Sequence, residues 1–225
     1  MSRPFLLTLD GPAGVGKSTT ARALAASLGL ACLDTGAMFR ILALALGRNG
    51  DFPRGREMAE ALAGFSFALR GTGAATILLC NGRPAGEEIR TEEAGAMASR
   101  LGLIPEVRSF LKTVQRNLGA VFPLVAEGRD MGTAIFPAAP CKLFLDARPE
   151  VRALRRQRQL REMGLEEEFD DLLRRIRERD EEDRNRPLAP LRPAPDAVLV
   201  DTSDLNPEEV LALCVRAARR AGRPG

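Results

Sequence analysis

The sequence predicts an α/β fold, a five-stranded parallel sheet with helices on both faces. Short apolar runs of strand length alternate with longer helical patterns, which is typical of a parallel sheet. A glycine-rich loop, Gly11–Ser18, separates the first apolar run from the first helix, as in nucleotide-binding folds. Between Gly47 and Ile89 the alternation gives way to a hairpin pattern, which predicts a small inserted antiparallel β lobe.

The order of the core elements follows from these apolar runs. We expect the strands of the sheet at 5–10, 31–33, 124–126, 142–146 and 197–201. We expect helices at 18–28, about 37–46, 91–101, 105–121, about 149–163, 165–184 and from 207 onward. Gly29 and Gly164 end helices, Pro105 and Pro207 suit first turns, and Asn206 suits an N-cap.

The inserted lobe is predicted from turn residues. Phe65–Leu69 alternates apolar and other residues, and a turn at Gly71–Gly73 separates it from a second strand pattern at Thr76–Cys80. Asn81-Gly82 is a strong signal for a further tight turn.

The glycine-rich loop predicts binding of a nucleoside triphosphate. Its glycines let backbone N–H groups turn inward around phosphate oxygens, and the following helix adds its positive N-terminal dipole. Lys17 is placed to reach the β- and γ-phosphates, and the Ser18 hydroxyl to hold Mg²⁺.

Composition narrows the class of protein. A chain of 225 residues with 45% apolar residues suits one large domain with inserted lobes. The sequence shows neither an 18-residue apolar run nor a basic-then-apolar leader, so we expect a cytoplasmic protein without a membrane partner. It has no histidine, and its four cysteines are widely spaced, which argues against a zinc site, histidine acid–base chemistry and disulfides.

Arginine-rich segments predict a second anionic substrate. All but three of the 33 basic residues are arginines. Several follow predicted strand ends or crowd the charged helices, where guanidinium groups grip phosphate and offset its charge. The alternative for this region is a pair of solvated helices laced with ion pairs. Nucleic acid is a poor candidate because the chain lacks tyrosine and tryptophan for base stacking.

Several motifs in one order resemble bacterial cytidylate kinase, in the nucleoside monophosphate kinase family of P-loop proteins. They are Gly11–Thr19, Asp34–Arg40, Glu88–Thr91, Gly128–Thr133, Lys142–Ala147, Arg179–Arg186 and Ala189–Leu191. The resemblance covers nearly the whole chain as one domain. It implies a core of 1–36, 106–150 and 187–225, a monophosphate-binding lobe with the β insert at about 37–105, and a short helical lid at about 151–186.

The resemblance implies ATP-dependent phosphorylation of CMP and dCMP with Mg²⁺, by a protein expected to be monomeric. ATP would contact Gly11, Pro12, Ala13, Gly14, Val15, Gly16, Lys17, Ser18, Thr19, Arg155 and Arg156. CMP would contact Thr35, Arg40, Ser99, Arg108, Arg129, Asp130, Arg179, Asp183 and Arg186. The catalytic set would be Lys17, Arg129, Arg155, Arg156 and Arg186, with Ser18 as the metal ligand.

Within the CMP set, Ser99, Arg108 and Asp130 would face cytosine, and Arg40, Arg129 and Arg186 the phosphate. Arg179 and Asp183 would bind the sugar hydroxyls. Phe39 stands where tyrosine is frequent, so a hydroxyl is lost there.

Alternatives remain open at this level. Asp34 has a structural explanation as a helix cap, and Asp130 as an ion-pair partner of Arg129. Glu127 ends a strand next to the motif, but we do not expect it to bind magnesium. The other functions are a kinase for UMP, AMP or shikimate on the same scaffold, and a nucleotide-binding switch without enzymatic activity.

Overall fold

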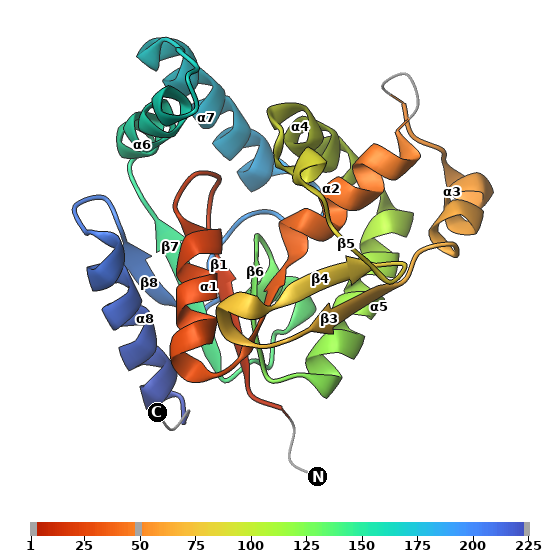
Figure 1. Ribbon diagram of the computed structural model, residues 1–225, viewed down its shortest axis with the longest axis horizontal. Coiled ribbons are helices and arrows are strands. Elements are labelled where there is room, and N and C mark those ends of the chain that lie inside the picture. Colours follow the sequence, from red (N-terminus) through yellow and green to blue (C-terminus); the bar gives the residue numbers. More distant parts are fainter. Residues whose placement is uncertain (1–3, 48–50, 223–225) are drawn as a thin grey trace.

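The computed structural model describes residues 4–47 and 51–222, and its centre is the predicted parallel sheet (Figure 1). The strand order is β2-β6-β1-β7-β8, and every neighbouring pair is parallel. The strands are β1 (Leu6–Asp10), β2 (Ala31–Asp34), β6 (Leu124–Gly128), β7 (Cys141–Asp146) and β8 (Val198–Asp201). The predicted fold class is confirmed, and the carboxyl ends of the strands share one edge.

Helices connect the strands over bounds close to those expected. They are α1 (Lys17–Leu28), α2 (Thr35–Leu46), α3 (Gly55–Leu62), α4 (Glu92–Leu101), α5 (Pro105–Val121), α6 (Pro149–Glu162), α7 (Phe169–Asn185) and α8 (Pro207–Arg220). Asn206 and Glu209 form a capping box at the start of α8, as the Asn-Pro pair suggested. None of the helices in the described residues combines the length and apolar character needed to span a bilayer.

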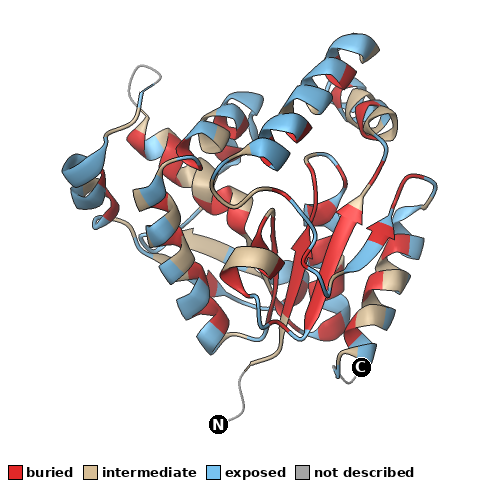
Figure 2. Ribbon diagram, turned by 180° about the vertical axis from the view of Figure 1, so that it is seen from behind, coloured by how far each residue is buried: buried red, intermediate tan, exposed pale blue. Residues whose placement is uncertain are grey.

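Two apolar cores cover the two faces of the sheet. Leu7 and Leu9 of β1 pack with α1 and α8 on one face. Leu124 and Ala126 of β6 pack with α2 and α5 on the other. Each of these four residues has an exposed fraction of 0%, and Figure 2 shows the strands as a buried band between helices. This rigid sheet fixes the ends of β1, β6 and β7, where the candidate site lies.

The antiparallel insert has three strands, β3 (Phe67–Arg70), β4 (Ile77–Cys80) and β5 (Arg83–Pro84). It is attached to the β2 side of the sheet. The backbone N–H of Cys32 donates to Thr76 Oγ1 at 3.1 Å, and that of Gly73 donates to Leu30 O at 2.7 Å. A short helical turn, Gly73–Ala75, connects β3 to β4, and another, Glu87–Arg90, follows β5. Residues 48–50 of the segment in which the insert was predicted lie outside the described part of the chain.

Helices α6 and α7 pack on each other through a small core of their own and stand beyond the carboxyl edge of the sheet (Figure 1). The expected helix over 165–184 begins only at Phe169. Gly164, with φ +74°, and Leu165 instead close the end of α6. Gly164 N–H donates to Arg161 O and Leu165 N–H to Leu160 O, a Schellman arrangement that leaves 165–168 outside any helix.

The elements that were not anticipated from the sequence include α3, β5 and a π-helical turn over Met131–Ile135. The π-helical turn is separated from the end of β6 by Arg129 and Asp130 alone. It lies at the carboxyl edge of the sheet, so its conformation bears directly on the candidate site.

Candidate functional site

The phosphate loop has the geometry that its glycines require. Gly16 ends the loop in the left-handed region at φ +92°, immediately before α1 begins. Gly11 lies so close to β7 that an added Cβ would stand 2.2 Å from Leu145 O, a clash with backbone that no side chain can relieve. Only glycine fits at Gly11, and the close approach presses the loop onto the sheet edge.

Lys17 is buried at the base of this loop, with an exposed fraction of 6%. Its Nζ donates to Pro12 O at 2.6 Å, so the ammonium group is folded back under the loop. Burial lowers the pKa of Lys17, and the nearby positive charge of Arg129 lowers it further, while Glu127 acts in the opposite sense. A bound phosphate would supply the negative charge that this ammonium group lacks.

Glu127 lies beside the phosphate loop, although it is not among the residues predicted for the site. It ends β6 with an exposed fraction of 4%, and its Oε1 accepts the Ser18 hydroxyl at 2.5 Å. Burial is the largest cause of its raised pKa, and the charge of Asp34 adds to it. Its backbone oxygen accepts Thr35 Oγ1 at 2.7 Å. The signal that could have identified Glu127 is its place in the sequence, as an acidic residue directly before Gly128-Arg129-Asp130.

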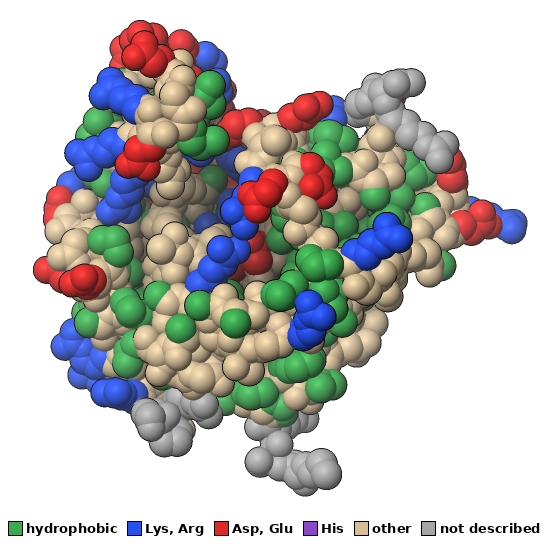
Figure 3. All heavy atoms as spheres, in the orientation of Figure 1, with side chains coloured by type: hydrophobic (Ala, Val, Ile, Leu, Met, Phe, Trp, Pro, Cys, Tyr) green, Lys and Arg blue, Asp and Glu red, His purple; other side chains and the backbone are tan. Residues whose placement is uncertain are grey.

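Across from the loop, arginines gather around one carboxylate. Arg129, at the end of β6, donates from Nε to Asp183 Oδ2 at 2.9 Å, and Arg186 Nη1 lies 3.6 Å from Asp183 Oδ1. Burial opposes ionisation of Asp183, but the charge and hydrogen bond of Arg129, together with the charges of Arg186 and Arg179, outweigh it and lower the pKa. The surface is hollowed between the α6–α7 pair and the α2–α4 side, and Lys and Arg side chains line part of the hollow (Figure 3).

The guanidinium groups of Arg179 and Arg186 have unused hydrogen-bonding capacity. Within the described residues, Arg179 Nε and Arg186 Nη2 are buried without a hydrogen-bond partner. Burial, then the charge of Arg129, lowers the pKa of Arg179, and Arg40 contributes in the same direction. Clustered positive charges with free donors favour binding of an anion such as a phosphate group.

Asp130 is paired with Arg108 rather than with Arg129. Arg108, on α5, contacts an Asp130 carboxylate oxygen directly through Nη2, and Arg186 Nη2 lies 3.8 Å from the other oxygen. The suggested pairing with Arg129 was wrong because that side chain turns to Asp183 instead. Ser99, on α4, is half-buried.

A buried carboxylate fixes the backbone beside Asp130. Asp10, the last residue of β1, accepts the N–H groups of Met131 at 2.8 Å and Gly132 at 2.7 Å. Arg116 of α5 holds the other end of the π-helical turn through the carbonyls of Ala134 and Ile135. Burial raises the pKa of Asp10 to about 6, although the two backbone hydrogen bonds act against that rise.

The predicted lid arginines have other partners. Arg155 donates to Thr202 O at 2.6 Å, after the end of β8, and Arg156 pairs with Glu92 at the start of α4. Neither of these contacts reaches the phosphate loop. Asp34 caps α2 by accepting Ala37 N–H at 2.9 Å, which confirms its structural explanation.

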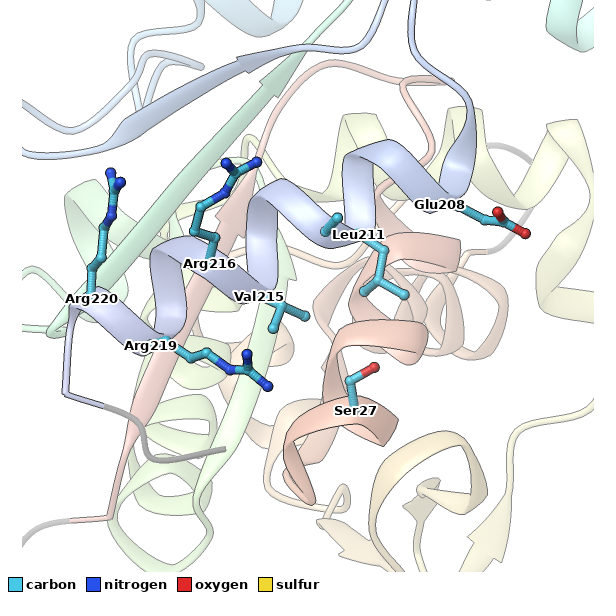
Figure 4. A pocket seen from close by; sticks show the side chains of 8 residues that line it. Ser27, Glu208, Leu211, Val215, Arg216, Arg219 and Arg220 are labelled. Atoms are coloured by element: carbon cyan, nitrogen blue, oxygen red, sulfur yellow. The ribbon is translucent and has the colours of Figure 1, made fainter.

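A groove of about 810 Å³ lies elsewhere, between α1 and α8 (Figure 4). Its lining includes Ser27, in the last turn of α1, and Arg216, Arg219 and Arg220 of α8. Lys17 begins α1 and Ser27 is near its end, and the lining of the groove includes no residue of the phosphate loop.

Comparisons with known proteins give the relatives of this chain. The family model for "Cytidylate kinase" matches residues 7–220. A cytidylate kinase of Nitratidesulfovibrio vulgaris (strain Hildenborough) is 54% identical over 214 residues, covering 95% of this chain and 92% of that protein. One of Oleidesulfovibrio alaskensis is 52% identical over 212 residues, covering 94% and 97%. A solved shikimate kinase of Bacteroides thetaiotaomicron aligns with a TM-score of 0.49 at 14% identity, covering 96% and 97%.

Proposed function

This chain belongs to the cytidylate kinase family, and from that membership we propose how its residues transfer the γ-phosphoryl group of ATP to CMP. The family match spans residues 7–220, so it includes the phosphate loop and the arginine cluster across from it. This is the observation that carries the assignment. We further propose dCMP as an acceptor, because it carries the same base and phosphate as CMP and keeps the 3′-hydroxyl for Arg179 and Asp183.

ATP is proposed to bind with its phosphates in the loop Gly11–Thr19. The loop's backbone N–H groups and the N-terminus of α1 offer partial positive charge. Lys17 would leave its contact with Pro12 O and reach the β- and γ-phosphates, because a charged phosphate is a stronger partner for an ammonium group than a carbonyl.

Mg²⁺ fits the oxygen donors beside this loop. The Ser18 hydroxyl and the Glu127 carboxylate are already within hydrogen-bond distance of each other. Mg²⁺ is usually held by one or two protein ligands together with substrate phosphates. We propose Ser18 as its protein ligand. A bound Mg²⁺ offsets phosphate charge during transfer.

CMP is proposed to bind across from the loop. Arg40, Arg129 and Arg186 would hold its phosphate, and Arg179 and Asp183 its sugar. Asp130 would accept a hydrogen bond from the cytosine amino group, and Arg108 and Ser99 would complete the base site. Thr35 would also contact CMP. Uracil carries a carbonyl in place of that amino group, so the carboxylate would repel it.

No general base is required for this reaction. The acceptor is a phosphate oxygen that is already anionic, so catalysis consists of positioning the two nucleotides and stabilising charge. Lys17, Arg129 and Arg186 would surround the transferring group. Arg155 and Arg156 would join them if α6 and α7 close over ATP and break the contacts with Thr202 and Glu92.

An acceptor panel tests this assignment. ADP release, measured with a coupled assay, should be fastest with CMP and dCMP, by at least about tenfold over UMP, AMP and shikimate. A different preferred acceptor would make the chain another kinase on the same scaffold. Slow ATP turnover that no acceptor accelerates would favour a nucleotide-binding switch.

We also propose that the protein works as a monomer in the cytoplasm. Both proposals rest on the family relationship. Size-exclusion chromatography with light scattering tests the monomer, with an expected mass close to the 24.3 kDa of one chain. Cell fractionation tests the location.

A further inference from the structure

Arg152 is a buried charged residue that belongs to neither proposed nucleotide site. It lies in the first turns of α6 with an exposed fraction of 1%, the least exposed of the buried charged side chains. Its guanidinium group contacts three separate segments. Nη1 donates to Ala13 O of the phosphate loop at 3.1 Å, and Nε donates to Ala147 O, before α6, at 3.0 Å. Both Nη atoms pair with the Asp180 carboxylate of α7, one of them at 2.9 Å.

The contact with Ala13 O bears on the donor site. A trans peptide is planar, so its C=O and the following N–H point in opposite directions. By holding Ala13 O, Arg152 fixes the direction of the Gly14 N–H in the middle of the phosphate loop. That N–H is one of the groups proposed to cradle the phosphates of ATP.

The contact with Asp180 bears on the acceptor site. Asp180 is 3% exposed and stands directly after Arg179 and three residues before Asp183 on α7. A two-pronged pair between a guanidinium group and a carboxylate fixes relative orientation as well as distance. The pair with Arg152 therefore sets how α7 presents Arg179 and Asp183 to the arginine cluster around Arg129.

We propose that Arg152 is a positioning residue that couples the two nucleotide sites, so that binding of the donor favours binding of the monophosphate and the reverse. This inference rests on the proposed function. One guanidinium group sets both a phosphate-loop peptide and the helix that carries acceptor ligands, so a nucleotide that orders one segment orders the other through it. Binding of the second nucleotide then costs less ordering.

Calorimetric titration of the full chain tests the coupling. CMP is titrated with and without saturating ADP, and ADP with and without saturating CMP. In the wild type, each nucleotide should lower the Kd of the other by the same factor, about tenfold, because linkage is reciprocal. In Arg152→Lys, which keeps a charge but loses the fork, and in Arg152→Met, the factor should fall to about one.

A double variant distinguishes the proposed coupling from a purely structural role of the buried pair. Removing one partner of a buried ion pair leaves an unpaired charge, whereas replacing both with apolar residues is often tolerated. Arg152→Met/Asp180→Leu should therefore regain thermal stability over Arg152→Met while the coupling stays lost. If coupling returns with stability, the proposal is overturned. Arg161→Met, which removes an exposed guanidinium from the same helix, should keep the wild-type factor.

Two further outcomes distinguish a failure of the coupling from a failure of the kinase assignment. Independent binding of ADP and CMP to the wild type would overturn the coupling while leaving the kinase assignment intact. A wild type that binds ATP but neither binds nor phosphorylates CMP would instead refute the proposed function.

Discussion

Asp10 Oδ2 lies 2.7 Å from the backbone nitrogen of Gly132, so the residue directly before the phosphate loop also holds the backbone next to Asp130. The contact joins β1 to the π-helical turn after β6. The base of the donor loop and the proposed cytosine-binding segment thus share one buried carboxylate.

Replacing Asp10 should change how stability depends on pH. The raised pKa of Asp10, about 6, means that the folded protein holds this proton more tightly than the unfolded chain. Its contribution to stability is therefore fully present below the unfolded pKa of about 3.9 and is lost as pH rises to about 6. Relative to Asp10→Asn, the wild type should lose up to roughly 3 kcal/mol of unfolding free energy over that range.

Urea denaturation of both proteins at several pH values between 4 and 7 measures this difference. Asp51→Asn, which removes an exposed carboxylate, is the control and should run parallel to the wild type. Parallel curves for Asp10→Asn as well would show that Asp10 titrates alike in the folded and unfolded chain.

Lys17→Ala should abolish phosphoryl transfer. The variant removes the ammonium group proposed to stabilise the γ-phosphoryl group, and we expect kcat to fall by about 10³-fold or more. Steady-state kinetics with saturating CMP measures the loss. Lys112→Ala, on α5 and outside the site, should keep normal rates. An active Lys17→Ala enzyme would remove Lys17 from the mechanism.

Arg129→Ala should chiefly weaken the binding of CMP. Loss of a charge-assisted contact to the monophosphate is expected to raise KM for CMP by at least about tenfold, with a much smaller change in KM for ATP. The exposed Arg184 of α7 supplies the control, Arg184→Ala, which should leave both constants unchanged. Equal increases in both KM values would point to a general distortion instead.

Asp130→Asn should relax the choice between CMP and UMP. An asparagine amide can donate to the uracil carbonyl that the carboxylate repels, so we expect the ratio of kcat/KM for CMP over UMP to fall by about tenfold. Competition between the two acceptors measures this ratio directly. The amide keeps an oxygen for Arg108 but removes the negative charge of that buried pair, so the melting temperature should fall and is measured alongside. An unchanged ratio would place base selection elsewhere.

Much of the fold could be predicted because its signals are local. Gly29 ends α1, and Asn206 caps α8 with Glu209, as their residue types indicate. The place of the candidate site follows from one further rule, that parallel strands end at a common edge, whereas the roles of its residues were expected from the family resemblance. Lys17 after β1 and Arg129 after β6 meet near that edge for this reason, with Arg129 influencing the pKa of Lys17.

The partners of buried charges could not be predicted because they are distant in sequence. Asp10 and Gly132 are 122 positions apart, and Ser18 and Glu127 are 109 apart. Arg152 looked like one of many arginines on a solvated helix until packing of α6 on α7 buried it. The π-helical turn likewise depends on Asp10 and Arg116, which no local pattern connects to it.

The attachment of the hairpin insert to β2 also bears on how separate molecules behave toward each other. β2 is an outer strand of the sheet, and an outer strand with free N–H and C=O groups invites strands of other molecules to add to it. Thr76 occupies the Cys32 N–H of that strand from within the same chain. A version of the protein shortened by removing the hairpin would therefore be prone to self-association, even where its phosphate loop stays intact.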